Sequence, residues 1–282
     1  MLDCNLYKGE IFFMKNRLFI VEGVPCTGKT SISEFIASVL KEAEKDVLYF
    51  KEGASNHPSD YDFHAYLTNK HFSKFSNDEK EILLINSVKI NSGYVISLSN
   101  INGELFNKVI QYKIYDMLPW EIEYPIMLNK WEEFFENAKT NENIYVFDCC
   151  FLQNPLCETM MRFNMKSQEI YDYIDSIYER IEALNPIVIY LKNTNIKQRI
   201  QDISKERENE WIEGVIEYHT SQGYGKSYGH IGFDGYVECL KARQEIELAI
   251  LKKLKINKLI IENPFENWDI THSTIKKFIN EL

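Results

Sequence analysis

The chain has 282 residues, of which 45% are hydrophobic and 26% charged, and its formal net charge is −10. This composition is typical of a globular protein and argues against wholesale disorder. Lys and Arg are interleaved with Asp and Glu, so no basic patch offsets the repulsion between an acidic chain and a phosphate backbone. No apolar run is long enough to span a membrane, and the first residues lack the order of a signal peptide. We therefore expect a cytoplasmic protein with neither nucleic acid nor a membrane as partner.

The N-terminal residues and the cysteines carry little functional signal. Met14, followed by Lys15, is a plausible second translation start. We therefore expect residues 1–16 to form a peripheral extension. The six cysteines follow neither a disulfide nor a zinc-ribbon spacing, and the adjacent pair Cys149 and Cys150 would point to opposite faces of a strand. We expect free cysteines, used as small apolar residues in a reducing compartment.

Five short runs rich in β-branched and aromatic residues predict buried parallel strands, and helical periodicities between them predict an α/β fold. The runs are Arg17–Glu22, Asp46–Lys51, Asn143–Asp148, Ile187–Leu191 and Lys258–Glu262. Apolar residues recur at helical spacing directly after residue 30, from Ser167 to Leu184, and from Tyr236 to Leu254. The sequence thus predicts one domain of three layers, a five-stranded parallel sheet with helices on both faces.

Two segments between these strands are expected to form substrate-side structure. Residues 53–142 show helical patterns and no strong strand, with a good helix start at Ser76 before Glu79–Lys89 and a second at Asn102. This stretch is too long for a structureless loop, so we expect a helical insertion between the second and third strands. Residues 193–236 are expected to be lid-like and end in a segment rich in Gly and Tyr. For that end, a mobile aromatic loop and simple packing against the lid are both open alternatives.

A glycine-rich loop follows the first predicted strand. It fits the pattern G-x-x-x-x-G-K-[ST] without departure, and the residues expected to bind nucleotide are Gly23, Val24, Pro25, Cys26, Thr27, Gly28, Lys29, Thr30 and the following Ser31. An apolar strand before the pattern and an amphipathic helix after it are the context in which such a loop binds phosphate. The backbone N–H groups and the helix N-terminus attract the anion, Lys29 neutralises phosphate charge, and Thr30 is placed to ligate Mg²⁺.

The string IVEGVPCTGKTS, with Glu22 directly before the loop, resembles the first strand and loop of thymidylate kinases and deoxynucleoside kinases. The resemblance is strong over residues 17–35, and elsewhere it depends on the order of elements. It implies the P-loop NTPase fold, with ATP as co-substrate and Mg²⁺ as cofactor. No NKxD sequence of the kind that reads a guanine base in GTPases is present in the chain.

The resemblance also implies roles for four further residues. Glu52, at the end of the second predicted strand, takes the position of the acid that meets the substrate hydroxyl, and Asp148, at the end of the third, that of the second metal-binding acid. Arg199 and Arg207 fall where such kinases carry lid arginines; their spacing of eight is close to two helical turns and predicts one helix face. The chain departs from deoxynucleoside kinases in having Asp148-Cys149-Cys150 where they have an acid, Arg and Ser, which puts a standard nucleoside substrate in doubt.

Other polar residues near these strand ends are weaker candidates. His57, Asp60 and Asp62 follow the second predicted strand and could line the same cleft, and Gln153 and Asn154 follow the third and could contact a polar substrate. Each of them is also an ordinary loop or surface residue.

The leading hypothesis from the sequence is an ATP-dependent kinase that phosphorylates a hydroxyl or phosphate of a small polar molecule. Lys29, Glu52, Arg199 and Arg207 are its expected catalytic residues, and Thr30 and Asp148 its metal ligands. The alternative is a regulatory P-loop ATPase or GTPase that hydrolyses nucleotide without a small acceptor. The sequence names neither the acceptor nor the oligomeric state, and it leaves a homodimer open.

Overall fold

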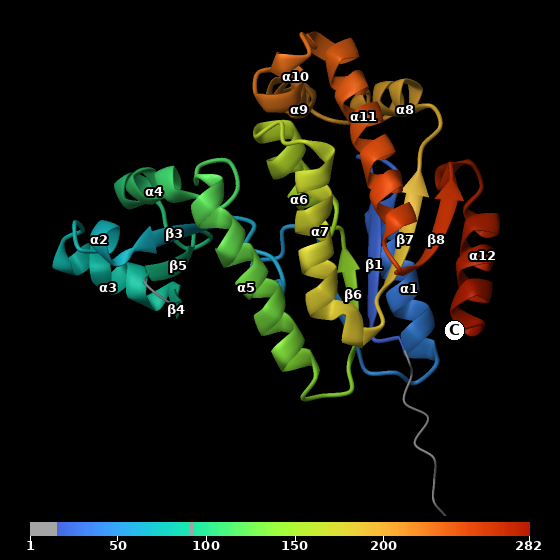
Figure 1. Cartoon of the computed structure of the whole chain (residues 1–282), viewed down its shortest axis with the longest axis horizontal. Helices are drawn as coiled ribbons and strands as arrows, with labels where there is room; N and C mark the ends of the chain where they lie inside the picture. Colours follow the sequence, from blue (N-terminus) through green and yellow to red (C-terminus); the bar gives the residue numbers. More distant parts are fainter. Residues whose placement is uncertain (1–15, 91–92) are drawn as a thin grey trace, which may run out of the picture.

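The structure, a computed structural model, describes residues 16–90 and 93–282. The extension predicted at residues 1–16 lies outside this range, apart from Asn16, which is buried. The helices and strands are numbered along the chain in Figure 1.

The centre of the molecule is a parallel sheet of five strands in the order β2-β6-β1-β7-β8. These strands are β1 (Leu18–Gly23), β2 (Val47–Phe50), β6 (Ile144–Asp148), β7 (Ile187–Lys192) and β8 (Asn257–Glu262). They are the five strands predicted from the sequence. Each observed strand end lies within one residue of the predicted end. The chain runs from β1 to one side of the sheet and later from β6 to the other, so the carboxyl ends beside β1 form a topological switch point.

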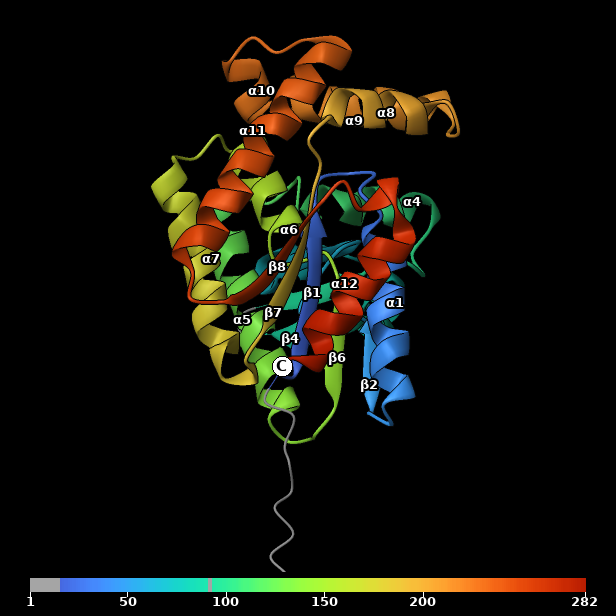
Figure 2. The same cartoon turned by 90° about the vertical axis from the view of Figure 1, so that its right-hand side faces the viewer.

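Helices cover both faces of this sheet, which gives a three-layer α/β arrangement (Figure 2). The layer on one face is formed by α1 (Lys29–Glu42) and α12 (Trp268–Asn280), and that on the other by α5 (Trp120–Ala138), α7 (Ser167–Ile181) and α11 (Gly232–Lys253). Alternate residues of β1 point to opposite faces, so Phe19 packs with the first layer while Ile20 packs with the second. Both faces of β1 are therefore buried, as the continuous apolar run predicted.

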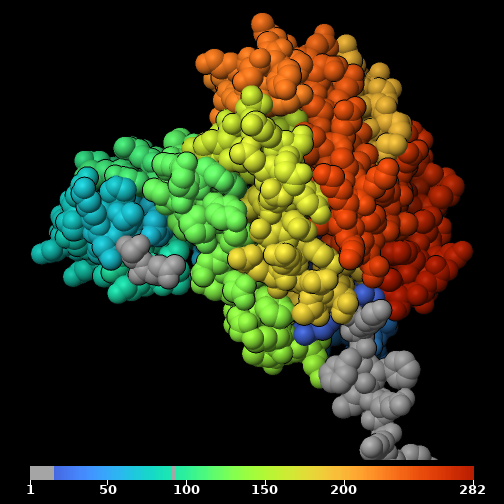
Figure 3. Space-filling model, in the orientation of Figure 1, coloured from blue at the N-terminus to red at the C-terminus, as the bar shows by residue number. Residues whose placement is uncertain are grey.

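The insertion between β2 and β6 is not purely helical, and in this respect the prediction was wrong. It contains an antiparallel sheet of three strands in the order β3-β5-β4 and projects from the body of the molecule (Figures 1 and 3). Its elements are β3 (His64–Thr68), α2 (Asn69–Phe72), α3 (Asn77–Ile85), β4 (Ser87–Ile90), β5 (Gly93–Ser97), α4 (Gly103–Val109) and the 3₁₀ turn η1 (Ile110–Tyr112). Strands of four or five residues are too short to show a period, and they pair with one another, with one further bridge from Ala65 of β3 to Lys113.

Both helix starts predicted in the insertion are found. Ser76 and Glu79 form a capping box at α3, which ends at Ile85 rather than Lys89 because β4 follows. Asn102 takes the N-cap position of α4 without a side-chain hydrogen bond.

The lid-like region after β7 is helical throughout most of its length. It consists of α8 (Ile196–Ser204), α9 (Asn209–Thr220) and α10 (Gly223–Ser227), followed by the start of α11. The loop considered for residues 217–236 is therefore mostly helix. Gly225 allows close packing there, because a Cβ at this position would lie 2.0 Å from the carbonyl oxygen of His219.

Short turns complete the described fold. They are α6 (Gln153–Leu156), the π-helix η2 (Cys157–Arg162), and the 3₁₀ turns η3 (Glu182–Leu184) and η4 (Pro264–Glu266). Among the helices of the described residues, none combines the length and apolar character needed to cross a membrane.

Candidate functional site

The glycine loop connects the end of β1 to the start of α1. Gly23 and Gly28 have φ angles of 147° and 92°, a region that residues with a Cβ rarely adopt. A Cβ on Gly28 would also lie 2.5 Å from the ring of Trp268, the first residue of α12. Both glycines are therefore required by the path of the backbone, which turns sharply before α1 begins.

The interior of the loop is held by hydrogen bonds to one carbonyl group. The Thr27 hydroxyl and the Lys29 ammonium both donate to the carbonyl oxygen of Val24, at 2.9 and 3.3 Å. No described residue accepts a hydrogen bond from the backbone N–H groups of Cys26, Thr27 or Gly28. The loop is thus closed by side chains, while three of its backbone donors remain available to an anion.

A cavity of about 470 Å³ lies in front of this loop. Its lining comes from the loop, the strand ends and the lid: Pro25, Cys26, Gly28, Lys29, Thr30, Ser31, Glu52, Gln153, Cys157, Arg199, Ile203, Arg207, Trp211, Val215, His219 and Arg243. All four predicted catalytic residues are in this set. Gly23, Val24 and Thr27 are buried behind the cavity wall and shape the loop from within.

Thr30 and Asp148, the predicted metal ligands, lie in direct contact. The Thr30 hydroxyl donates to Asp148 Oδ2 at 2.6 Å, while Asp148 Oδ1 is buried without a hydrogen-bond partner. Burial raises the pKa of Asp148, which the bond from Thr30 partly offsets. A hydroxyl beside a carboxylate with a free oxygen fits Mg²⁺, which prefers oxygen ligands. Among the described residues no group of three or more His, Cys, Asp and Glu side chains could hold a metal, so such an ion would take further oxygens from a bound nucleotide or water.

Glu52 lies beside Asp148 at the rim of the cavity. Its Oε1 accepts a hydrogen bond from Gln153 Nε2 at 2.5 Å, and its backbone N–H lies close enough to Asp148 to lower the pKa of that carboxyl. Glu52 itself is exposed, so its carboxylate can reach a molecule in the cavity. The ends of β2 and β6 thus bring together the two acids that the sequence separates by almost a hundred residues.

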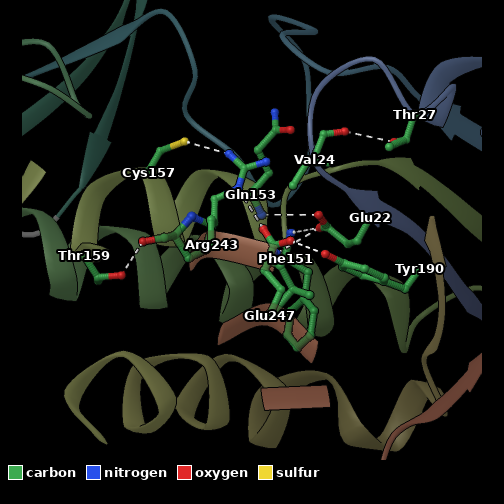
Figure 4. A network of polar contacts seen from close by, with 12 residues as sticks. Glu22, Val24, Thr27, Phe151, Gln153, Cys157, Thr159, Tyr190, Arg243 and Glu247 are labelled. Carbon is green, nitrogen blue, oxygen red and sulfur yellow. Dashed lines mark hydrogen bonds and ion pairs between the residues drawn. The ribbon is translucent and has the colours of Figure 1, made fainter. Parts of the chain in front are cut away.

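Glu22 plays a structural part in the site. Its fully buried carboxylate accepts hydrogen bonds from the backbone N–H groups of four consecutive residues that follow β6, from Cys150 to Gln153. Figure 4 shows Glu22 with Phe151 and Gln153 beside it. Burial raises the pKa of Glu22 to about 7, although the bonds from these N–H groups oppose the shift. Glu22 therefore ties the start of the loop to the segment that carries Gln153.

The two lid arginines both reach the cavity, but they are not on one helix. Arg199 lies on α8, where its Nε donates to the carbonyl oxygen of Cys26 at 2.9 Å and its guanidinium lies 4.2 Å from the ring centre of Phe265. The helix ends at Ser204, and Arg207 lies in the following turn with its guanidinium 4.3 Å from the ring centre of Trp211. The predicted common helix face was wrong, and the two side chains converge through the turn between α8 and α9.

Cys26 takes part in the loop through its backbone. The pKa of its thiol is raised, mainly by burial, so the side chain is neutral at ordinary pH. A neutral thiol fits the expected use of the cysteines as small apolar residues.

The polar residues considered after β2 lie elsewhere. His57 and Asp60 line a second cavity of about 520 Å³ beside the insertion, and Asp62 lines a third of about 270 Å³ together with Asn154. None of them lines the cavity at the loop. His57, Asp60 and Asp62, which the sequence left open as candidates for the same cleft, do not line it, because the chain after Glu52 turns toward the insertion sheet.

Sequence reasoning missed Arg243 and His219, which line the cavity from α11 and α9. A signal was present in the sequence: Leu240, Arg243 and Glu247 recur at helical spacing, which places an oppositely charged pair on the buried face of a helix.

Comparison with protein-family models found none that matches the chain, and no curated protein sequence matches it. The resemblance of the glycine loop to kinase loops therefore depends on the residues of this chain alone.

Proposed function

We propose that the chain is a P-loop small-molecule kinase that transfers the γ-phosphoryl group of ATP to a hydroxyl or phosphate of a small polar acceptor. The observation that carries this proposal is one cavity lined jointly by the glycine loop, the acid at the end of β2 and the lid arginines. Phosphoryl transfer depends mainly on positioning and charge neutralisation, and these residue types supply both.

The phosphate end of the site is the loop itself. Its free backbone N–H groups and the N-terminus of α1 favour a polyphosphate, and Lys29 can turn from the carbonyl oxygen of Val24 to a phosphate oxygen. Thr30 and Asp148 would hold Mg²⁺, whose charge, when bound, offsets that of the phosphates.

The acceptor end of the site is marked by Glu52. In the proposed reaction the acceptor oxygen forms a bond to the γ-phosphorus, the bond from that phosphorus to the β–γ bridging oxygen breaks, and ADP leaves. Glu52 orients the acceptor hydroxyl and takes its proton, while the Gln153 amide holds the carboxylate in place. Arg199 and Arg207 approach from the lid, where their charge stabilises the transferring group.

The alternative function, a regulatory ATPase or GTPase, would use the same loop but no acceptor. Turnover of ATP and GTP should be followed as nucleoside diphosphate release, with and without a panel of nucleosides, nucleotides, sugars and amino sugars. We expect turnover to rise with one class of acceptor and to be abolished by Lys29→Ala. Lys41→Ala, an exposed lysine in the last turn of α1, is the matched control and should retain activity. Steady hydrolysis that no acceptor changes would favour the alternative.

A further inference from the structure

Arg243 is a buried arginine in the lining of the cavity. Its side chain is 1% exposed, and its Nε lies 3.1 Å from Glu247 Oε1, an ion pair without the direction of a hydrogen bond. The other oxygen of Glu247 accepts a hydrogen bond from the Tyr190 hydroxyl at 2.5 Å. Figure 4 shows the guanidinium with Glu247 on one side and Cys157 on the other. Glu247 and Tyr190 therefore fix Arg243 from the protein side.

The far side of the guanidinium has no comparable partner. Its Nη1 donates only to the sulfur of Cys157, at 3.5 Å, and its Nη2 is buried with no hydrogen-bond partner among the described residues. A charged donor that is removed from water without an acceptor is strongly destabilising, so its retention indicates a bound acceptor. Holding Glu247 alone would not require the guanidinium to line the cavity.

The neighbours of Arg243 in the cavity wall do not neutralise it. Burial raises the pKa of Cys157 to about 11, so the group beside Nη1 is a neutral thiol. Burial and the charge of Arg243 lower the pKa of His219 to about 4, so that imidazole is neutral as well. Its Nδ1 donates to the carbonyl oxygen of Val215 at 2.7 Å, which leaves Nε2 as a buried acceptor without a partner. Gln153 Oε1 is a second such acceptor in the same wall.

We propose that Arg243 forms an oxyanion subsite in the inner wall of the cavity, with Gln153 and His219 as acceptors for hydroxyl groups beside it. The planar guanidinium presents two adjacent nitrogens, the arrangement that binds phosphate or carboxylate in a bidentate manner. The ligand class is an oxyanion, supplied either by the phosphoryl group in transfer or by an anionic group of the acceptor. Its assignment to phosphoryl transfer rests on the proposed function, whereas anion binding at Arg243 does not.

The test is calorimetric binding of inorganic phosphate to the full chain and to a double variant, Arg243→Met with Glu247→Gln. The second substitution removes the carboxylate that would otherwise be left buried and unpaired, and its amide oxygen can still accept from Tyr190. We expect phosphate to bind the wild-type chain at both the glycine loop and Arg243, and the double variant to keep the loop site while its affinity at the second site falls at least about tenfold. Arg243→Lys keeps the positive charge but loses the two adjacent nitrogens of the guanidinium, so it should give an intermediate affinity for phosphate.

Arg17→Met is the control for loss of a partly buried arginine. Arg17 lies at the amino end of β1 and donates to the carbonyl oxygens of Ala138 and Asn143 at 2.9 and 3.0 Å, far along the strand from the loop. This variant should bind phosphate as the wild-type chain does. Equal phosphate affinity in the wild-type chain and the double variant, or no phosphate binding to the wild type, would overturn the proposal.

Two further titrations identify the source of the oxyanion. Phosphate is added to chain saturated with Mg·ADP, and to chain saturated with Mg²⁺ and a non-hydrolysable ATP analogue. Binding in the first case alone assigns the subsite to the transferring phosphoryl group, and binding in both assigns it to the acceptor. If nucleotide fails to bind while phosphate still depends on Arg243, the proposed kinase function fails and the anion subsite stands.

Discussion

At the scale of single residues, the proposed Mg²⁺ site depends on the contact between Thr30 and Asp148. The two side chains come from the start of α1 and the end of β6, and the Thr30 hydroxyl donates to the Asp148 carboxylate at 2.6 Å. The unpartnered Oδ1 of Asp148 is a buried acceptor, and burial raises the pKa of its carboxyl. A bound cation would satisfy this oxygen and favour its ionised form.

Replacing Asp148 with Asn tests this role. Asp148→Asn keeps the shape of the side chain but removes its charge, so we expect a higher Mg²⁺ concentration for half-maximal turnover and a fall of roughly a hundredfold in turnover. Asp46→Asn, an exposed residue before β2, is the control. Unchanged Mg²⁺ dependence in Asp148→Asn would contradict the assignment of this site.

At this scale, whether a contact in the site could be predicted from the sequence depends on how far apart its two residues lie in the chain. The loop residues are contiguous, so their pattern alone predicted where they would converge. The spacing of Arg243 and Glu247 on one helix is visible in the sequence, but the contact of Arg243 with Cys157 became visible only in the fold. A contact between residues 86 positions apart has no local signature.

At the scale of elements, the junction of α5 with η2 contains a second buried charge cluster. Glu123 lies on α5 and is fully buried, and it accepts a hydrogen bond from the backbone N–H of Tyr115 at 2.9 Å. Arg162 forms an ion pair with the neighbouring Glu158 at 2.7 Å and lies 3.8 Å from Glu123. Burial, and then the charge of Glu158, raise the pKa of Glu123 well above its usual value.

This raised pKa makes the stability of the protein depend on pH. The folded state keeps a proton on Glu123 that the unfolded chain loses above about pH 4.5, so stability falls as pH rises from there through the folded pKa. Glu123→Gln mimics the protonated form. It should therefore remove the part of the pH-dependent loss of stability that comes from Glu123, which is at most about 1.4 kcal/mol per pH unit. Its melting temperature relative to wild type should therefore increase steadily between pH 5 and pH 8.

Glu121→Gln, an exposed residue in the first turn of the same helix, is the matched control and should show no such trend. A difference in melting temperature between Glu123→Gln and wild type that stays constant with pH would contradict the raised pKa.

The elements also show where prediction from periodicity succeeds. The three central strands of the main sheet, β1, β6 and β7, are buried on two faces, so each gives a continuous apolar run that the sequence displays. The edge strands β2 and β8 are partly exposed, yet their runs of β-branched and aromatic residues still predicted them. The strands β3, β4 and β5 carry exposed and half-buried residues, such as Lys89 and Val88, and their short runs merge into the helical patterns around them. Their pairing depends on contacts across the insertion.

At the scale of the whole molecule, the cavity lies between the carboxyl ends of the main-sheet strands and the lid. The carboxyl ends of β1, β2 and β6 supply the loop, Glu52 and Asp148, and the lid helices lie above them in Figure 1. The main-sheet order, in which β1 lies between strands reached in opposite directions, places the loop at the switch point. Among the described residues, the lid and not the insertion lines this cavity, so the lid is the part that would set the acceptor specificity of the proposed kinase.

The central claim is that backbone N–H groups of the loop bind the polyphosphate of a nucleotide. It is tested most directly by NMR of the ¹⁵N-labelled chain during titration with Mg·ADP. The account predicts that the amide resonances of Cys26, Thr27 and Gly28 shift strongly, while those of β3 in the insertion change little. Nucleotide binding that leaves these three loop resonances unmoved, or no change anywhere in the spectrum, would contradict it.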